Sequence, residues 1–299
     1  MRVFVTGATG FIGTAIVKEL INNGHQVLGL ARSEASAEKL KAAGAEVHKG
    51  DLQDLDSLRS GAEAADGVIH AGFIHDFTRF PEVCAVDKVA IETIAEVLKG
   101  SDRPLVITSG TALVSPGRLA TEDIIPPFNP AFPRASEVAA DEAAAKGIKT
   151  SVIRLSPSVH GEDDLHGFVP ILINLAREKG VSAYIGEGLN RWNAVHRLDA
   201  ARLYRLALEN EKAEPGTRFH GAAEQEIPMK AIAEIIGRKL NIPVVSRSKE
   251  EAPEHFGWFF HFASIDAPAS SQLTQQRLNW HPSHPKLLED LEGNVYFKS

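Results

Sequence analysis

The sequence predicts an α/β fold in which a doubly wound parallel sheet is followed by a smaller C-terminal lobe. Three observations favour this fold class. Short apolar runs alternate with helical patterns through the first half, a glycine-rich turn separates the first run from the first helix, and the alternation weakens after Pro157. Strands that alternate with helices are joined by right-handed crossovers, so we expect parallel strands covered by helices on both faces.

The first half of the chain supplies the sheet. Strands are predicted at residues 3–5, 26–30, 46–48, 68–70, 105–108 and 151–155. Helices are predicted at residues 13–23, 34–43, 86–98 and 136–146. Gly24, Gly100 and Gly147 end three of these helices, since glycine adopts the left-handed conformation of a helix C-terminus.

In the second half of the chain the regular alternation of predicted strands and helices weakens. Prolines, glycines and aromatic residues become denser, and the clear helices are those at 168–179, 198–209 and 228–240. Pro228 suits the first position of the last helix, where no backbone N–H is needed. We expect this half to form a smaller lobe that closes over the carboxyl edge of the sheet.

Composition and charge exclude several classes of protein. The 299 residues are 43% hydrophobic and 24% charged, as in ordinary globular proteins, and 32 basic against 39 acidic residues give a net charge of −7. No long run of Lys or Arg supports nucleic-acid binding, and no apolar stretch approaches the roughly 20 residues of a membrane span. Cys84 is the only cysteine, which excludes an intrachain disulfide, and no metal-ligand spacing is present. The N-terminus runs straight into the strand at 3–5 and leaves no room for a signal peptide, so we expect a cytoplasmic location.

A glycine-rich turn at residues 6–13 joins the first strand to the first helix. Gly7 allows the tight turn, Gly10 lets a pyrophosphate approach the backbone, and Gly13 lets helix and strand pack closely. The free N–H groups and the positive dipole end of the helix favour phosphate, although a tight turn without a ligand is the alternative. The position of the motif favours a Rossmann-type dinucleotide site, contacted by Gly7, Thr9, Gly10, Phe11 and Ile12.

The end of the second strand favours NADP(H) over NAD(H). An NAD site usually has an acidic residue there to bind the ribose 2′-hydroxyl, but this chain has Ala31. Arg32 follows and can grip a 2′-phosphate through charge-assisted hydrogen bonds, to which Ser33 adds another. The alternative is an arginine solvated at the end of a strand.

Two further segments fit the rest of a dinucleotide. Asp51 can accept a hydrogen bond from the adenine amino group while Leu52 packs on the ring; helix capping by Asp51 and Asp54 is the alternative. Ala71 and Gly72 are small residues after the strand at 68–70, where the backbone can meet the sugar of the cofactor.

Together these residues resemble the extended short-chain dehydrogenases/reductases of the NAD-dependent epimerase/dehydratase type. The matching segments are 6–13, 51–52, 68–71, 107–109, 154–161, 194–201 and 278–282. The resemblance implies a dinucleotide-binding domain at 1–157, to which 191–215 returns, and a substrate lobe at 158–190 and 216–299. It also implies that Pro157, Ser158 and Val159 approach the nicotinamide amide, while Arg154 is expected to be a structural salt-bridge partner.

The resemblance also implies a catalytic centre that this chain only partly matches. Ser109 and Thr111 are the candidates for the family's Ser or Thr after the fifth strand, and Ser109 also lies beside the cofactor. Alignment on Ser136 puts Pro133 at the position of the family's catalytic Tyr and Glu137 at that of its Lys. None of the three tyrosines begins a Y-x-x-x-K motif, so the chain looks like an atypical member.

Without that pair, acid–base assistance worth about 10²–10⁴-fold comes from elsewhere or is not needed. Arg134 can stabilise developing oxyanion charge as a fixed cation. A His or Tyr of the lobe can supply the proton. An iminium substrate needs no acid, because it is already protonated.

The substrate-site candidates are His75, His160, Tyr184 and Trp192. His75 lies where a loop can reach the substrate, with a solvated loop as the alternative. His160 lies in a family motif, with packing of the lobe as the alternative. Tyr184 and Trp192 lie in the segment that lines the family's substrate pocket, and Trp192 either walls an aromatic pocket or packs between lobe and sheet.

We therefore expect NADP(H)-dependent hydride transfer to or from a small, apolar carbonyl or imine. The alternatives are an epimerase, dehydratase or lyase that retains its cofactor, and a non-catalytic NADP(H) sensor or regulator. The resemblance also implies a homodimer through the helices at 86–98 and 136–146, although the Ala-rich face of the second helix fits intramolecular packing equally well.

Overall fold

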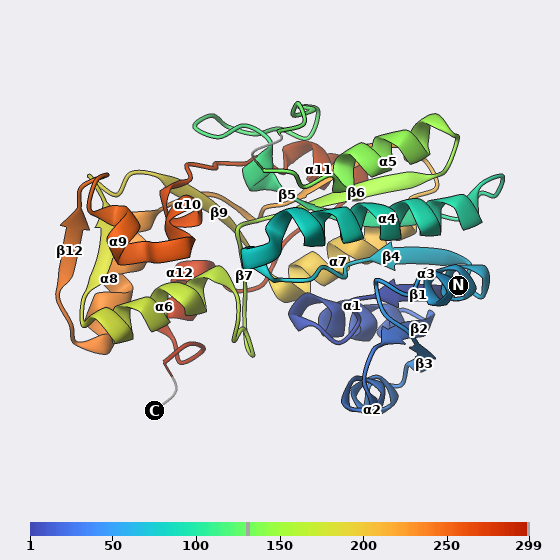
Figure 1. Cartoon of the computed structure of the whole chain (residues 1–299), viewed down its shortest axis with the longest axis horizontal. Helices are drawn as coiled ribbons and strands as arrows, with labels where there is room; N and C mark the ends of the chain where they lie inside the picture. The colour runs from blue at the N-terminus through green and yellow to red at the C-terminus, as the bar shows by residue number, and fades with distance from the viewer. Residues whose placement is uncertain (130–131, 298–299) are drawn as a thin grey trace.

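The structure, a computed structural model, describes residues 1–129 and 132–297. The chain forms two parts (Figure 1): a large sheet between two layers of helices, and a smaller lobe, at the left of the figure, built from the second half of the sequence. The doubly wound α/β fold is thus confirmed.

The large sheet is seven-stranded, with the order β10-β6-β5-β4-β1-β2-β3, and all of its strand pairs are parallel. Its strands are β1 (Arg2–Thr6), β2 (Gln26–Ala31), β3 (Glu46–Lys49), β4 (Gly67–His70), β5 (Leu105–Gly110), β6 (Thr150–Leu155) and β10 (Thr217–Gly221). The strand order reverses between β1 and β4, and ligands of open α/β sheets bind in the crevice at the carboxyl ends of the strands beside such a switch. The strands predicted from 3–5 to 151–155 are confirmed. Strand β10 was expected in the lobe but extends the large sheet.

Helices cover both faces of this sheet. One face packs against α1 (Phe11–Asn22), α2 (Glu34–Ala42), α7 (Arg197–Leu208) and α11 (Gln272–Leu278). The other face packs against α3 (Leu55–Glu63), α4 (Phe80–Leu98) and α5 (Ser136–Ala145). Helix α4 begins at Phe80, earlier than the predicted start at residue 86. Pro81 does not prevent this, since it lies in the first turn of the helix, where proline is tolerated.

The lobe has its own core and two small sheets. The first sheet holds β7 (Ser158–His160), β9 (Arg191–His196) and β11 (Glu224–Pro228), and the second holds β8 (Ser182–Ile185) and β12 (Val244–Arg247). Around them lie α6 (Phe168–Lys179), α8 (Met229–Leu240), α9 (Ala252–Phe256), α10 (Phe260–Ser264) and α12 (Leu287–Glu292). Short 3₁₀ helices occur at η1 (Phe77–Arg79), η2 (Thr111–Leu113) and η3 (Gly257–Phe259). The predicted helix at 168–179 is confirmed with the same bounds.

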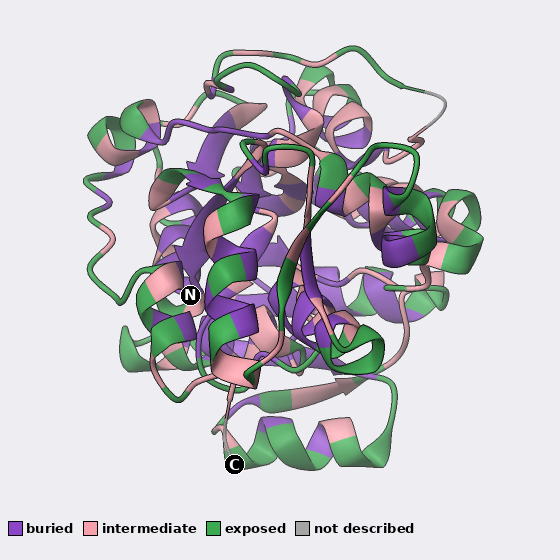
Figure 2. Ribbon diagram, turned by 90° about the vertical axis from the view of Figure 1, so that its left-hand side faces the viewer, coloured by how far each residue is buried: buried purple, intermediate pink, exposed green. Residues whose placement is uncertain are grey.

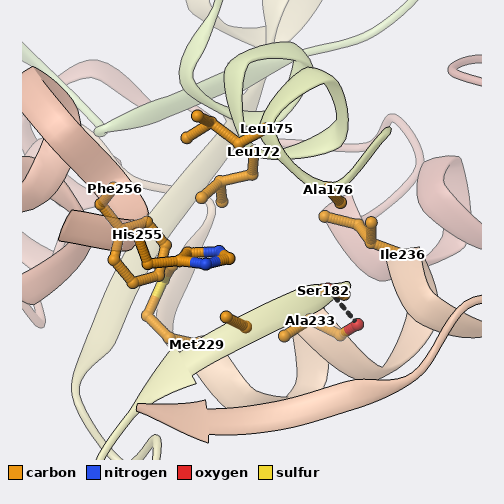
Figure 3. A pocket seen from close by; sticks show the side chains of 10 residues that line it. Leu172, Leu175, Ala176, Ser182, Met229, Ala233, Ile236, His255 and Phe256 are labelled. Atoms are coloured by element: carbon orange, nitrogen blue, oxygen red, sulfur yellow. Dashed lines mark hydrogen bonds between the residues drawn. The ribbon is translucent and has the colours of Figure 1, made fainter. Parts of the chain in front are cut away.

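Burial follows this division. In Figure 2 the strands are mainly purple, for buried, and the outer faces of the helices are green, for exposed. The lobe core contains a cavity of about 10 Å³ between α6, α8 and His255 (Figure 3), which has room for one water molecule at most. This cavity lies away from the carboxyl edge of the large sheet and is too small for a substrate.

Candidate active site

The glycine-rich turn leaves the first helix open to an anion. Gly7 has φ +67°, and an ideal Cβ there would lie 2.7 Å from the carbonyl oxygen of Ala71. A Cβ on Gly13 would lie 1.9 Å from the carbonyl oxygen of Gly7, so the close packing needs both glycines. Helix α1 follows Gly10, has no side-chain cap and has no acidic residue in its first turn. Its N–H groups are therefore free of competing side chains, as a diphosphate site requires.

A cleft of about 310 Å³ lies at the carboxyl ends of β2 and β3. It is lined by Ala31, Arg32, Ser33, Glu34, Lys49, Gly50, Asp51 and Asp54. The Ser33 hydroxyl caps α2, since it accepts from the Ser36 N–H at 3.2 Å. Lys49 Nζ lies 3.5 Å from Glu34, and both side chains are exposed. The sequence singled out Arg32 and Ser33 but missed Lys49, whose signal was its position at the end of a strand directly before Gly50 and Asp51.

The two acids after β3 have different roles. Asp54 caps α3 by accepting from the Ser57 N–H at 3.2 Å. Asp51 is half-buried and accepts from the Gln53 N–H at 2.9 Å. The capping alternative thus holds for Asp54, while Asp51 remains in the lining of the cleft. Leu52 lies between this cleft and Gly72, where an added Cβ would be 3.2 Å from its side chain.

At the other end of the sheet edge, small residues and an unpaired hydroxyl fit the nicotinamide half of a dinucleotide. The Gly72 N–H donates to Thr6 Oγ1 at 3.1 Å, which holds Ala71 and Gly72 against the turn. Ser158 is 2% exposed, and among the described residues its hydroxyl has no hydrogen-bond partner. A buried hydroxyl without a partner is costly, so a polar ligand group there would be favourable. The open glycine turn, the cleft at Arg32 and the unpaired Ser158 hydroxyl are thus each compatible with a part of a dinucleotide.

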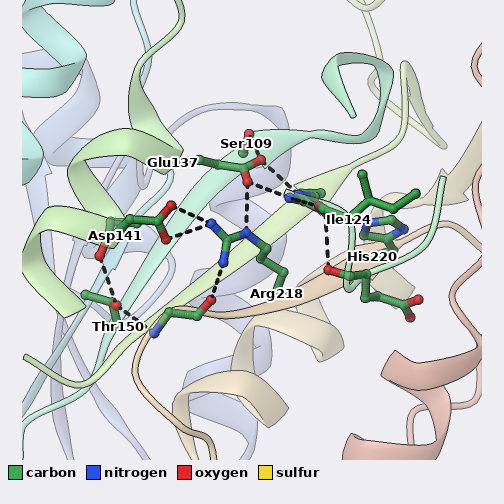
Figure 4. A network of polar contacts seen from close by, with 11 residues as sticks. Ser109, Ile124, Glu137, Asp141, Thr150, Arg218 and His220 are labelled. Carbon is green, nitrogen blue, oxygen red and sulfur yellow. Dashed lines mark hydrogen bonds and ion pairs between the residues drawn. The ribbon is translucent and has the colours of Figure 1, made fainter. Parts of the chain in front are cut away.

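The Ser109 hydroxyl donates to Glu137, which is the centre of a buried ion-pair network (Figure 4). The distance from Ser109 Oγ to Glu137 Oε1 is 2.8 Å. Arg154 donates to both carboxylate oxygens of Glu137, at 2.9 and 2.6 Å, and Arg218 Nε donates to Oε2 at 3.1 Å. Burial raises the pKa of Glu137, but hydrogen bonds from Arg154 and the charge of Arg154 outweigh it and hold the pKa below its ordinary value. Glu137 is therefore ionised and only accepts hydrogen bonds, so it fixes the Ser109 proton.

Thr111 is placed differently from Ser109. Its side chain is 1% exposed, and its Oγ1 lies 3.2 Å from the Leu155 carbonyl oxygen and 3.0 Å from Asn193 Oδ1. These contacts join the end of β5 to β6 and to the lobe strand β9. The hydroxyl is thus used to hold the two parts together, which corrects its interpretation as a catalytic group.

Arg134 is a fixed cation at the end of β5. Its Nη2 donates to the Thr108 carbonyl at 3.3 Å, its Nε donates to Ser136 Oγ at 3.1 Å, and its guanidinium lies 4.2 Å from the centre of the Phe73 ring. Ser136 Oγ in turn donates to Asp87 Oδ2 at 2.6 Å. These contacts hold the guanidinium in one place, as a preorganised oxyanion stabiliser requires.

The buried Asp87 carboxylate balances the charge of Arg134. Asp87 is 2% exposed, and its Oδ1 lies 3.2 Å from His70 Nε2. Burial raises the pKa of Asp87, but the hydrogen bond from His70 and the charge of Arg134 outweigh it and lower the pKa. His70 Nδ1 lies 3.0 Å from Thr6 Oγ1, so a continuous hydrogen-bond chain connects the glycine-rich turn to Arg134.

His75 lies beside Arg134 with part of its surface in solvent. Its ring packs edge-on against Phe73 and Phe77, at centroid distances of 5.4 and 6.2 Å. Desolvation lowers the pKa of His75, and the charge of Arg134 lowers it further. The imidazole is therefore neutral at neutral pH.

Three of the substrate-site candidates lie away from this edge. Trp192 is fully buried in the lobe core, where its Nε1 donates to the Phe262 carbonyl at 3.2 Å. His160 is 1% exposed, with its Nδ1 2.6 Å from Asp290 Oδ2. His160 thus packs within the lobe, and Trp192 packs in the core of the lobe rather than between lobe and sheet. Tyr184 lies on β8, whose partner β12 is at the far left of Figure 1, and its ring faces Lys230 Nζ at 5.6 Å.

The other two tyrosines are also engaged. Tyr204 is fully buried, its hydroxyl lies 2.7 Å from Thr108 Oγ1, and burial raises its pKa. Tyr296 donates to Asp164 Oδ2 at 3.0 Å, and burial raises the pKa of this phenol as well. Neither hydroxyl is placed to act as a general acid beside Ser109.

The described ranges, 1–129 and 132–297, contain neither a membrane span nor a metal cluster. No helix there combines the length and the apolar character needed to cross a bilayer. No group of three or more His, Cys, Asp or Glu side chains in these ranges is arranged to hold a metal ion.

Three features of this chain are those of the extended short-chain dehydrogenases/reductases: the strand order of the large sheet, the glycine-rich turn after β1, and Ser109 at the carboxyl end of β5. The chain belongs to the NAD dependent epimerase/dehydratase family, whose family model matches residues 3–220. It is 53% identical over 298 residues to an uncharacterized protein of Schizosaccharomyces pombe, in a match that covers 99% of this chain and 100% of that protein. It is 30% identical over 225 residues, 70% of this chain and 67% of the other, to sterol-4-alpha-carboxylate 3-dehydrogenase, decarboxylating, of Dictyostelium discoideum.

A solved structure shares the whole fold. The dTDP-glucose 4,6-dehydratase DesIV of Streptomyces venezuelae, solved with NAD bound, superposes with a TM-score of 0.76 over 98% of this chain and 95% of that chain. The two sequences are 18% identical, so this likeness concerns the fold.

Proposed function

We propose that the chain is an NADP(H)-dependent oxidoreductase that transfers hydride to or from a small, apolar carbonyl compound. The observation that carries the proposal is the cleft of about 310 Å³ at the ends of β2 and β3. Arg32, Ser33 and Lys49 surround it, so it presents two cations and a hydroxyl where an adenosine 2′-phosphate would lie. Glu34 and Lys49 form an exposed ion pair and offset each other, so the attraction for a 2′-phosphate rests mainly on Arg32, against the carboxylates of Asp51 and Asp54 in the same lining.

Different residues along the carboxyl edge of the sheet would bind different parts of the dinucleotide. The turn at Gly7, Thr9, Gly10, Phe11 and Ile12 would hold the diphosphate, Asp51 and Leu52 the adenine, and Ala71, Gly72, Pro157, Ser158 and Val159 the nicotinamide half. The bound dinucleotide supplies or accepts hydride. Arg134 stabilises the negative charge that develops on the substrate oxygen. Ser109 donates its proton to Glu137, so in this arrangement it does not donate to that oxygen.

The charge of Arg134 favours a carbonyl over an iminium. A carbonyl oxygen becomes negative as hydride arrives, which a nearby guanidinium stabilises. A protonated imine would bring a second positive charge beside Arg134 and be repelled. The name of the Dictyostelium relative, a sterol-carboxylate dehydrogenase, also supports oxidoreduction of an apolar compound.

Calorimetry with NADPH and NADH tests the cofactor half of this proposal. We expect NADPH to bind at least about tenfold more tightly, and Arg32→Ala to remove most of that preference. Lys39→Ala is the matched control, since it removes a cation from α2 outside the cleft. Absence of heat with both NADPH and NADP⁺ on folded protein would refute the proposal.

A non-catalytic NADP(H) sensor is the second candidate, favoured by the engagement of the Ser109 proton by Glu137. Oxidation of NADPH with ketones, aldehydes and cyclic imines separates the two. Tight NADPH binding without turnover of any of them would favour the sensor. Conversion of a substrate without net change of the cofactor would instead favour an epimerase or dehydratase.

Location and assembly are also proposed. A cytoplasmic location rests on the single cysteine, Cys84, which is buried on α4, and cell fractionation tests it. Ala139, Ala140 and Ala143 of α5 pack inside the chain's own core, so the intramolecular alternative holds for this Ala-rich face. A homodimer through α4 and α5 would use their outer faces, and sedimentation equilibrium would detect it.

A further inference from the structure

Aromatic side chains from both parts of the chain meet beside Arg134. The large part contributes Phe73, His75, Phe77, Phe80 and Phe132, and the lobe contributes Trp258, His261 and Phe262. We call these residues the aromatic cluster. It begins next to Gly72 and reaches Arg134 through the Phe73 ring, 4.2 Å from the guanidinium. The cluster therefore lies at the reacting end of the proposed site.

Two of the ring pairs that join the two parts are nearly parallel, whereas Phe262 meets Phe77 and Phe132 edge-on, at 68° and 77°. Trp258 stacks on Phe77 at a centroid distance of 5.3 Å and an interplanar angle of 19°, and Phe77 lies over Phe80 at 5.9 Å and 20°. The Phe132 ring faces His261 at 5.5 Å and 28°. Flat surfaces that face one another across a junction between two parts suit a flat ring between them.

The junction is accessible from solvent. Trp258 is 58% exposed, whereas the other two tryptophans, Trp192 and Trp280, are fully buried. Trp258 sits in the short 3₁₀ helix η3, after Gly257 with φ +54°. An exposed indole that contacts aromatic rings can exchange those contacts for a ligand ring at little cost in burial.

The polar groups at this place set the polarity of the ligand. Arg134 is the cation that faces the cluster, and the carboxylate that balances it, Asp87, is reached through Ser136 on the side away from the rings. Neutral His75 adds no charge. The combination of flat apolar walls with the Arg134 guanidinium suits a neutral aromatic molecule that carries a carbonyl oxygen.

We infer that the substrate is a flat aromatic carbonyl compound, whose ring displaces the Phe77 contact of Trp258 and stacks on the exposed indole while its oxygen faces Arg134. This inference rests on the proposed NADP(H)-dependent reaction. In the reductive direction the carbonyl carbon gains a hydride from NADPH, which becomes NADP⁺. The π electron pair of the carbonyl moves to oxygen, and a proton from solvent completes the alcohol.

Two bicyclic ketones of the same carbon skeleton test the inference. One is β-tetralone, which contains a flat aromatic ring, and the other is β-decalone, which is saturated. Neither carbonyl is conjugated, so their reactivities are similar. We expect β-tetralone to have the lower KM, by about tenfold, from stacking on two rings at roughly threefold each.

Variants of Trp258 test whether the lower KM for β-tetralone than for β-decalone depends on the aromatic cluster. Trp258→Ala should reduce the preference to threefold or less, and Trp258→Phe should restore it. Leu189→Ala, an exposed apolar side chain outside the cluster, is the control that should leave both KM values unchanged.

Ring binding is also measured without turnover. In the presence of NADP⁺, β-tetralone should quench the emission of Trp258, and Trp258→Phe should remove that quenching, since Trp192 and Trp280 are fully buried. Equal KM values for the two ketones, or a preference that survives in Trp258→Ala, would overturn the inference. If neither ketone oxidises NADPH but β-tetralone still quenches Trp258 more than β-decalone does, the proposed reaction fails and the ring site stands. Absence of both turnover and quenching overturns the inference.

Discussion

Removal of the charge on Glu137 should destabilise the whole fold. Glu137 is the carboxylate partner of Arg154, which is fully buried, and of Arg218, which is 9% exposed at the side chain. The change Glu137→Gln keeps the size of the side chain but leaves the Arg154 charge without a carboxylate partner. Arg154 keeps the carbonyl oxygens of Glu122 and Ile124, at 3.4 and 2.9 Å, as acceptors. Loss of one partner of a buried ion pair costs about 3–5 kcal/mol, so we expect a loss of about 3 kcal/mol in the free energy of unfolding.

Asp141→Asn is the matched control, because Asp141 also pairs with Arg218 but its side chain is 44% exposed. It should cost about 1 kcal/mol or less, since solvent screens an exposed pair. Urea unfolding followed by circular dichroism measures both values. A loss below about 1 kcal/mol in Glu137→Gln, or equal losses in the two variants, would refute the assignment of Glu137 as the charge that holds the buried arginines.

The same network fixes the sign of an acid effect. The pKa of Glu137 in the folded protein lies below its ordinary value of 4.5, so its contribution to stability is present above that pH. The contribution is lost as the pH falls through the lowered pKa of the folded state. The wild-type protein should therefore lose stability below about pH 4.5 more steeply than Glu137→Gln, which has no such group to protonate.

Three further predictions concern other places in the molecule. Arg134→Ala should lower kcat for ketones by about 10²–10³-fold with NADPH affinity unchanged, and unchanged turnover in steady-state assays would remove Arg134 from the mechanism. Gly7→Ala should abolish NADPH binding in calorimetry, because its Cβ would lie 2.7 Å from the Ala71 carbonyl oxygen and the φ of +67° is strained for alanine; near-normal affinity would contradict the role of the turn. Desolvation, and then the charge of His160, lowers the pKa of His196 to about 4, so its contribution to stability is present above 6.5 and declines as the pH falls from 6.5 towards 4. His196→Gln should flatten that part of a plot of melting temperature against pH, and an unaltered slope would contradict it.

The sequence predicted those parts of the fold whose signals are local. Strand β1, the glycine turn and α1 follow one another between residues 2 and 22, and each has its own pattern of apolar residues or glycines. Strand β10 has the sequence Thr-Arg-Phe-His-Gly and is buried because it pairs with β6, a partner distant in the chain. The lobe strands β7 and β12 are three and four residues long, too short for a periodic pattern.

The candidate site divides in the same way. The position of Arg32 after a strand is a local signal, and the structure puts Arg32 in the cleft. The surroundings of Trp192 are set by Phe168, Phe259 and Phe262, which lie in other segments, so the sequence left an aromatic pocket and packing between lobe and sheet as equal alternatives. The aromatic cluster likewise depends on residues 73–80 meeting residues 258–262, which only the folded chain shows.

The charges at the sheet edge bear on how a chain without a Y-x-x-x-K motif could carry out the proposed hydride transfer. Glu137, at the position where the family has Lys, would place a negative charge beside Ser109 if it stood alone, and a developing oxyanion would be repelled. Arg154 and Arg218 contact that carboxylate and offset its charge, while Arg218 also pairs with Asp141. The cation nearest the proposed substrate is then Arg134, which Ser136 and Asp87 hold from behind. A guanidinium stays charged at any physiological pH, so this arrangement replaces a titrating acid by a permanent charge. In the proposed reaction it would stabilise the alkoxide that hydride addition creates and leave protonation of that alkoxide to solvent. Such a division suits reduction of a reactive carbonyl better than deprotonation of a sugar hydroxyl.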